Sequence, residues 1–213
     1  MLTSGAGQDP VGIVLLGGES RRYGQEKHAV IWRGLTLLQH VIAGLPPERS
    51  DTIVVARPGQ DVPTDGVTVV RDSPELPPGP LRGLITGLEA CGGPTAWAVA
   101  CDLPGLRPAL LRMLREVRRP DADVVAPMWG GLLQPLCAYY SCSAAGRLRI
   151  AVGEGARSLR TAFRFLQVQE VWEEDLRASD PTGRSFLNIN RPEALEFLEE
   201  TRPPHESTGG DNP

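Results

Sequence analysis

The chain has 213 residues, of which 41% are hydrophobic and 23% are charged, and its formal net charge is -4 at pH 7. This length and composition fit one domain with a sizeable core, and the negative charge argues against broad electrostatic binding to nucleic acid. No apolar run approaches the ~20 residues of a bilayer crossing and the N-terminus lacks a secretory signal, so we expect a cytoplasmic protein without membrane or nucleic-acid partners.

The two ends of the chain differ in composition from the rest. Residues 1–10 are polar and contain glycine, and residues 202–213 combine Pro, Gly, Ser, Asn and acidic residues. Such composition predicts a flexible N-terminus and a disordered tail, which leaves a single domain at 11–201.

Apolar runs and amphipathic stretches alternate through the first part of the domain. The runs predict short buried strands at 11–16, 52–56, 67–70, 96–100 and 124–126. Helical spacing of apolar residues between them predicts helices at 36–45, 81–91 and 108–117. Alternation of this kind implies an α/β fold with three layers, built on a mostly parallel open sheet.

The pattern changes after Pro127. The sequence predicts an extended segment at 132–140, helices at 142–152 and 156–165, and strands at 168–172 and 186–189. A final helix is expected to begin near Pro192 and to end before Pro203.

The cysteines give no sign of a metal or redox site. Cys91, Cys101, Cys137 and Cys142 lack both C-x-x-C spacing and histidine partners. We therefore predict buried reduced thiols, which fits the expected compartment.

The loop after the first strand carries the strongest functional signal. Residues 15–27 read LLGGESRRYGQEK, which matches neither the Rossmann G-x-G-x-x-G turn nor the P-loop. Adjacent glycines let backbone N–H groups approach an anion, and these contacts would come from Leu15, Leu16, Gly17 and Gly18. Positive charge follows at Arg21, Arg22 and Lys27. A nucleotide triphosphate is the leading ligand, and a solvated surface loop is the alternative.

Two acidic residues follow predicted strands and are expected beside this loop. Asp102 comes after the strand at 96–100, and ligands of open parallel sheets lie beyond the carboxyl ends of the strands. One carboxylate together with phosphate oxygens suits Mg²⁺, whereas capping of the following helix is the structural alternative. Asp72 follows the strand at 67–70, where it could contact the nucleotide or initiate a turn before Pro74.

Five segments, in this order, resemble motifs of the MobA-like nucleotidyltransferases. They are the loop at 15–27, which is similar to L-x-G-G-x-S-x-R-x-G-x-[DE]-K, and GPLRG at 79–83, CDLP at 101–104, QPL at 134–136 and NINRPE at 188–193. The resemblance spans about residues 11–198 and implies a Rossmann-like nucleotidyltransferase fold. It also implies a nucleotide-binding half at about 11–105 and an acceptor half at about 106–201.

The resemblance further implies a reaction and its residues. GMP would pass from GTP to the phosphate of molybdopterin, with release of pyrophosphate and formation of the guanine dinucleotide cofactor. Asp102 would hold Mg²⁺, Lys27 would neutralise the triphosphate with Arg22 as a further catalytic residue, and Asp72 would contact the nucleotide. The acceptor contacts would be Arg157, Asn188 and Asn190. Molybdoenzyme apoproteins and other cofactor-biosynthesis proteins would be further partners.

Departures from the family pattern leave alternatives open. Leu16, Tyr23 and Glu26 stand where alanine, methionine and aspartate are usual, and residues 55–58 lack the asparagine often seen in guanylyl-transferring members. Transfer of CMP or use of another small phosphorylated acceptor is the alternative reaction. A non-catalytic protein that binds and delivers a nucleotide or cofactor is the alternative class. Asn190 could instead cap the final helix, and Arg157 could be a surface residue.

Overall fold

The computed structural model describes residues 8–17, 26–63, 65–189, 194 and 198. The strands predicted in the first part of the chain are β1 (Val11–Leu15), β4 (Thr52–Ala56), β5 (Thr68–Arg71), β6 (Thr95–Ala100) and β7 (Val124–Trp129). The predicted helices are α1 (Leu37–Gly44), α2 (Pro80–Ala90) and α3 (Pro108–Glu116). These predictions are confirmed, and β7 continues beyond the expected end.

The second part of the chain follows its prediction less closely. It contains β8 (Leu132–Leu133), β9 (Cys137–Ser141), α4 (Ala144–Gly153), α5 (Leu159–Ala162), η2 (Phe163–Phe165), β10 (Val168–Val171), α6 (Glu173–Leu176) and η3 (Arg184–Phe186). The predicted strand at 186–189 is wrong, because Phe186 closes η3 and stacks on Trp129 while Ile189 N–H donates to the Asp102 carbonyl. Most of the predicted final helix, including its expected start at Pro192, lies outside the described residues.

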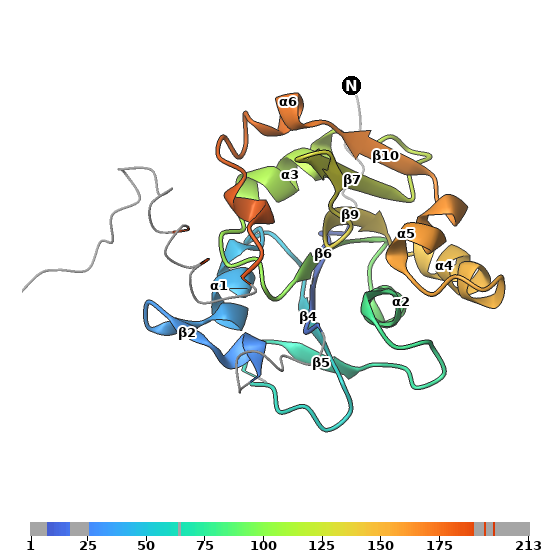
Figure 1. Cartoon of the computed structure of the whole chain (residues 1–213), viewed down its shortest axis with the longest axis horizontal. Coiled ribbons are helices and arrows are strands. Elements are labelled where there is room, and N and C mark those ends of the chain that lie inside the picture. The colour runs from blue at the N-terminus through green and yellow to red at the C-terminus, as the bar shows by residue number, and fades with distance from the viewer. Residues whose placement is uncertain (1–7, 18–25, 64, 190–193, 195–197, 199–213) are drawn as a thin grey trace, which may run out of the picture.

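The central sheet has the order β10-β7-β9-β6-β1-β4-β5, with β8 paired to β7. β9 and β8 pair antiparallel with their neighbours, whereas the other strand pairs of this sheet are parallel. In Figure 1, α1 and α3 cover one face, and α2, α4 and α5 cover the other. The three-layer, mostly parallel α/β fold is therefore confirmed.

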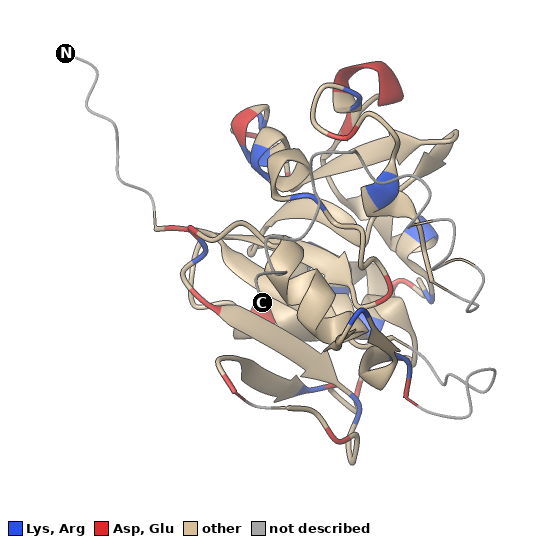
Figure 2. Ribbon diagram, turned by 90° about the vertical axis from the view of Figure 1, so that its left-hand side faces the viewer, with Lys and Arg blue, Asp and Glu red and all other residues tan. Residues whose placement is uncertain are grey.

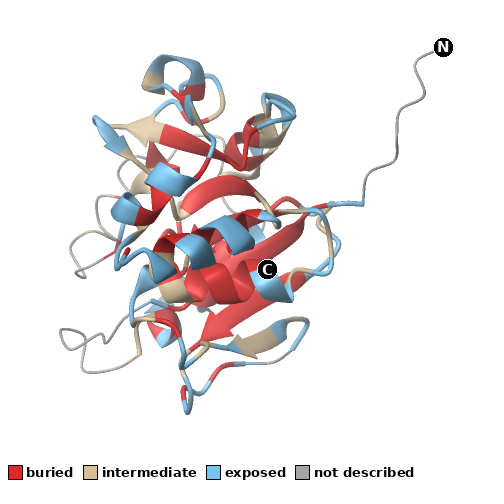
Figure 3. Ribbon diagram, turned by 90° about the vertical axis from the view of Figure 1, so that its right-hand side faces the viewer, coloured by how far each residue is buried: buried red, intermediate tan, exposed pale blue. Residues whose placement is uncertain are grey.

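Two apolar cores lie on the two faces of this sheet. Ile13 and Leu15 of β1 belong to the core beneath α2 and α4, whereas Val14 belongs to the core beneath α1 and α3. This alternation follows from the two-residue period of a strand. Buried sheet residues lie between helices whose outer faces are exposed (Figure 3), and charged residues gather mainly on helices and loops (Figure 2).

A small hairpin precedes α1 and was not predicted. It pairs β2 (Ile31–Trp32) with β3 (Leu35–Thr36) through Arg33 and Gly34, both of which have positive φ. Thr36 then forms a capping box with Gln39, which begins α1 directly after the hairpin. The Arg-Gly turn shows how two residues with φ above zero close a two-residue loop.

The prediction of reduced thiols is wrong for two of the four cysteines. Cys91, at the end of α2, forms a disulfide with Cys142, which precedes α4. Their Cα atoms are 6.4 Å apart, within the range that a disulfide spans. Cys101 and Cys137 are buried free thiols as expected. The fold brings together two cysteines 51 residues apart, a pairing that spacing alone did not indicate.

Within the described ranges, no helix has the length and apolar character needed to cross a bilayer.

Candidate functional site

The site is built at the carboxyl edge of the parallel part of the sheet. Leu15 pairs in register with Ala100 of β6, and the Cys101 N–H donates to the Leu15 carbonyl over 3.1 Å. Asp102 therefore emerges one strand away from the glycine loop. Asp72 directly follows β5, two strands away on the other side of β1. Three strand spacings of about 4.8 Å put roughly 14 Å between the ends of β5 and β6, with the end of β1 between them.

Three predicted residues from distant parts of the chain meet here. The Lys27 Nζ lies 2.7 Å from Asp102 Oδ2 and 3.3 Å from Asn188 Oδ1. The Lys27 and Asp102 side chains are 14% and 16% exposed, so the ion pair is partly shielded from solvent. Asp102 Oδ1 is buried, and among the described residues it has no hydrogen-bond partner. A buried carboxylate oxygen in this state is suited to a ligand or cation that arrives with substrate.

Lys27 is held by a network that the sequence did not indicate. It begins the short helix η1 (Lys27–Ala29), and the preceding Glu26 accepts from Arg57 Nη2 at 3.0 Å and from Gln60 Nε2 at 2.7 Å. Gln60 also contacts the buried His28 ring, with 3.3 Å between Nε2 and Nδ1. The loop after β4 therefore holds Glu26, the residue next to Lys27, in place.

Asp72 has the surroundings of a ligand-binding carboxylate. Its Oδ1 is buried and has no hydrogen-bond partner in the part of the chain that the structure describes. Burial raises the pKa of Asp72, although Arg82 and Arg57 oppose the shift. A Cβ at Gly83 would lie 3.5 Å from Leu15 and 3.6 Å from Asp72 Oδ1. Asp72, the first turn of α2 and the end of β1 therefore lie close together.

The remaining predicted nucleotide residues are only partly described. Leu15 and Leu16 are buried, whereas Gly17 is exposed, and a Cβ there would meet no described atom within 4 Å. Backbone at Gly17 is therefore open to an approaching anion. Gly18, Arg21 and Arg22 lie outside the described residues, as does Asn190.

Arg157 lies in the loop between α4 and α5 and contacts backbone. Its Nη1 donates to the carbonyls of Val152 and Ala156 at 3.1 and 2.9 Å. The bond to Val152 satisfies a carbonyl in the last turn of α4, and the bond to Ala156 holds the loop that follows, so both have a structural role. Among the described residues, the Arg157 side chain bonds to backbone carbonyls and not to Lys27 or Asp102, so its acceptor role stays a prediction.

No cysteine here has the properties of a nucleophile. Cys101 precedes Asp102, but burial raises the pKa of its thiol to about 12, and the neighbouring Asp102 adds to the shift. Burial also raises the pKa of the Cys137 thiol. Both thiols are therefore protonated at neutral pH, and chemistry at this edge would depend on alignment and charge.

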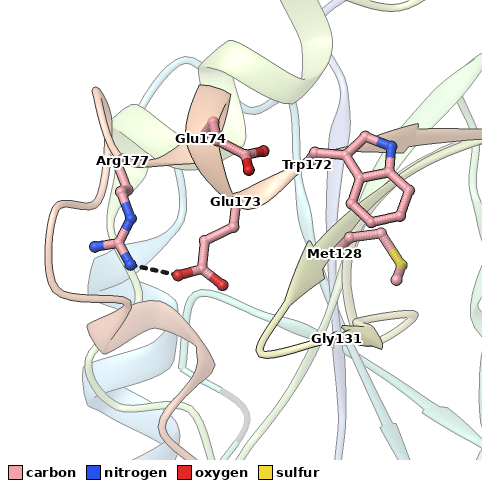
Figure 4. Close-up of a pocket in the computed structure, with 6 residues that line it drawn as sticks. All are labelled: Met128, Gly131, Trp172, Glu173, Glu174 and Arg177. Atoms are coloured by element: carbon pink, nitrogen blue, oxygen red, sulfur yellow. Dashed lines mark hydrogen bonds and ion pairs between the residues drawn. The ribbon is translucent and has the colours of Figure 1, made fainter.

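A pocket at the same edge of the sheet was also missed by the sequence analysis. It has a volume of about 380 Å³ and is lined by Met128, Gly131, Trp172, Glu173, Glu174 and Arg177 (Figure 4). Met128 lies near the end of β7, Gly131 follows β7, and the other four residues follow β10, so only positions at strand ends could have indicated the pocket.

Residues 12–171 match the family model of the MobA-like NTP transferase domain, which covers most of the chain. The chain belongs to this family. A probable molybdenum cofactor guanylyltransferase of Chloroflexus aggregans is 36% identical over 194 residues, or 88% of this chain and 92% of the relative. Another of Mycobacterium bovis is 40% identical over 156 residues, or 70% and 76% of the two chains.

Solved structures agree with this membership of the MobA-like family. The crystal structure of molybdopterin-guanine dinucleotide biosynthesis protein A from Archaeoglobus fulgidus has a TM-score of 0.74 and 29% identity, and it covers 89% of this chain and 97% of its own. The predicted family, the nucleotidyltransferase fold and the class of enzyme are therefore confirmed.

Proposed function

We propose that this protein transfers GMP from GTP to the phosphate of molybdopterin, releasing pyrophosphate and forming the guanine dinucleotide cofactor. The observation that carries the proposal is the meeting of Lys27, Asp102 and Asn188 near the end of β1, in a chain whose relatives are named guanylyltransferases. A lysine, a carboxylate and an amide at the carboxyl edge can neutralise and orient a triphosphate.

Asp102 fits a role in holding Mg²⁺. Its Oδ1 is buried and, within the described residues, lacks a partner. No group of three His, Cys, Asp or Glu side chains able to hold a metal occurs in the described ranges, so the cation would depend on Asp102 together with nucleotide oxygens. Mg²⁺ bound in this way supplies charge neutralisation for the phosphates.

The chain's own residues supply alignment. Lys27 would hold the triphosphate, with Arg22, Gly18 and the backbone of 15–17 around it, and Asp72 would orient the nucleoside. Asn188, Asn190 and Arg157 would contact the acceptor. An oxygen of the acceptor phosphate attacks the α-phosphorus, and the bond to the pyrophosphate oxygen breaks. The attacking oxygen is already anionic at neutral pH, so the step requires no protein general base, and direct attack on the α-phosphorus involves no covalent protein intermediate.

Transfer of CMP from CTP is the second candidate. The loop after β4 holds Arg57 against Glu26 and carries no asparagine at 55–58. A base pocket built differently from that of guanylyl-transferring members would change nucleotide selection.

Binding of GTP, CTP, ATP and UTP with Mg²⁺, measured by calorimetry on wild type and Lys27→Ala, tests the proposal. We expect GTP to bind most tightly and the variant to bind it at least about tenfold more weakly, because a charge-assisted contact to phosphate is lost. Selective CTP binding would assign the second candidate, and the absence of nucleotide binding would overturn both.

A further inference from the structure

The pocket that Figure 4 shows lies at the same sheet edge as Lys27 and Asp102. β7 and β9 are antiparallel, as are β9 and β6, so β7 and β6 run in the same direction. β10 is parallel to β7, and both strands end at the pocket. Two to three strand spacings separate the pocket from Asp102, a span of about 10–15 Å.

Side-chain packing connects the pocket region to the candidate site. Trp129, next to Met128, stacks on Phe186 with ring centroids 5.1 Å apart. Phe186 lies two residues before Asn188, whose Oδ1 is 3.3 Å from Lys27 Nζ. The pocket residue Arg177 also packs over the Trp129 ring, with its guanidinium carbon 5.2 Å from the ring centroid. Ring packing and a short length of backbone therefore connect the pocket wall to Asn188 and Lys27.

The pocket offers a flat apolar wall and one unengaged carboxylate. The Trp172 side chain is 53% exposed and lies above Met128 in Figure 4. Glu173 accepts from the Gly130 N–H at 3.1 Å and also binds Arg177. Glu174 has neither an ion pair nor a hydrogen bond to any residue the structure describes, and its carboxylate points toward the Trp172 side of the pocket.

These features select among ligand types. The pairing of Glu173 with Arg177 leaves the charge of Glu174 uncompensated, on a turn that is almost entirely acidic (Figure 2). Such a pocket repels phosphate, but it suits a planar ring with adjacent N–H donors, because a carboxylate accepts two parallel hydrogen bonds and an indole stacks on the ring face. A volume near 380 Å³ is sufficient for a bicyclic ring.

We propose that this pocket binds the ring end of a phosphorylated pterin acceptor, with the ring N–H and 2-amino group donating to Glu174 and the ring face against Trp172. The phosphate of the same molecule would then lie near Lys27, where the charge is favourable. This assignment rests on the proposed function for the identity of the acceptor, and it adds the two residues that recognise the ring. Glu174 and Trp172 are thus specificity residues for the acceptor.

Titration with 6-hydroxymethylpterin, which lacks the phosphate, tests the pocket without any turnover. The chain has four tryptophans, and the indole N–H signal of Trp172 is assigned by its loss in Trp172→Phe. We expect the pterin to shift this signal and to leave that of the buried Trp97 unchanged. Glu174→Gln should weaken binding about tenfold, and lumazine, which has an oxo group in place of the 2-amino group, should bind wild type more weakly than the pterin.

Glu170→Gln is the matched control, since this exposed carboxylate on β10 does not line the pocket. An unshifted Trp172 signal, or equal pterin affinity in wild type and Glu174→Gln, overturns the pocket assignment. If GTP binds and its GMP moiety is transferred in that case, the proposed function stands without the pocket assignment. If the pterin binds as expected but no nucleotide binds, the proposed function fails and the pocket assignment stands.

Discussion

Lys27 is the only lysine among the chain's 22 lysine and arginine residues. A compact ammonium can donate to Asp102 and Asn188 together, whereas a guanidinium has a planar fork and needs more space. The partly shielded position makes this difference important. The motif predicted Lys27 as a site residue. Only the fold shows that its ammonium also contacts Asn188, 161 positions away.

Lys27→Arg should retain the positive charge but lose the positions of the contacts to Asp102 and Asn188. We expect kcat/KM for GTP to fall about 100-fold, the cost of a misplaced electrostatic contact in a site that depends on alignment. Steady-state kinetics of pyrophosphate release measures it. Arg164→Lys, a swap at an exposed arginine, is the control and should have wild-type kinetics. Wild-type activity in Lys27→Arg would show that position 27 requires only a positive charge.

Asp72 should make the free protein less stable at neutral pH than an uncharged residue would. Burial raises its pKa, so the folded protein binds the proton more tightly than the unfolded chain does. Stability then falls as the pH rises from the unfolded pKa, about 3.9, through the raised folded pKa. Asp72→Asn should therefore raise the urea midpoint at pH 7, and the gain should shrink as the pH falls toward that lower value.

Nucleotide binding distinguishes this effect from a general gain in stability. Asp72→Asn should bind GTP more weakly than wild type although it unfolds at higher urea concentration. Glu75→Gln, at a nearby exposed position, should change neither quantity. A lower urea midpoint for Asp72→Asn at pH 7 would mean that the ionised carboxylate stabilises the free fold.

At the scale of elements, the segment that carries Asn188 depends on a close backbone approach. A Cβ at Gly105 would lie 2.5 Å from the Arg184 carbonyl oxygen and 2.9 Å from Leu198 Cδ1. Gly105→Ala should cost about 1–3 kcal/mol of unfolding free energy, because a backbone atom cannot yield as a flexible side chain does. It should also lower transfer activity, since a displacement of η3 would displace Asn188, which follows it by two residues. Urea unfolding and kinetics measure the two effects.

Gly146→Ala provides the matched comparison on α4. A Cβ there meets nothing within 4 Å among the described atoms. This substitution should raise stability by about 0.5–1 kcal/mol, since alanine favours a helix over glycine, and leave activity unchanged. Equal effects of the two substitutions would refute the packing of Gly105 against η3.

The disulfide joins the ends of two helices on one face of the sheet. Its 51-residue separation predicts that Cys91→Ser lowers the unfolding free energy by about 4 kcal/mol, since the unfolded chain gains conformational freedom. Urea unfolding without reductant measures the loss. Dithiothreitol should lower wild type to the same level and leave the variant unchanged. Four reactive thiols in the denatured, non-reduced protein would contradict the disulfide.

Local pattern explains which elements could be predicted. β4 has the predicted bounds because an apolar run of β-branched residues ends at polar positions on both sides. Residues 186–189 also have the local pattern of a strand, but in the fold Phe186 stacks on Trp129 and the segment does not join the sheet. The same limit applies to the site. Its motif residues were predictable, whereas the Glu26–Arg57–Gln60 network and the Trp172 pocket arise from segments that only the fold brings together.

For the whole molecule, the strand order places the candidate site and the pocket at the same edge of the sheet. Parallel β5, β4, β1 and β6 place the nucleotide residues along one part of that edge, and β7 and β10 extend it toward the pocket. β9 lies between the two parts and is antiparallel to both β6 and β7, so β6 and β7 run in the same direction. A donor and an acceptor can therefore bind side by side across a continuous surface.

Formation of the guanine dinucleotide cofactor from GTP, Mg²⁺ and molybdopterin by the purified protein is the direct test of guanylyl transfer. We expect one pyrophosphate to be released for each dinucleotide formed, and mass spectrometry to detect the dinucleotide. We also expect about a 100-fold lower rate in Asp102→Asn, provided that this variant is folded, because the carboxylate proposed to hold the charge-neutralising Mg²⁺ is lost. Product formed only from CTP, or an unchanged rate in Asp102→Asn, would contradict the proposed function.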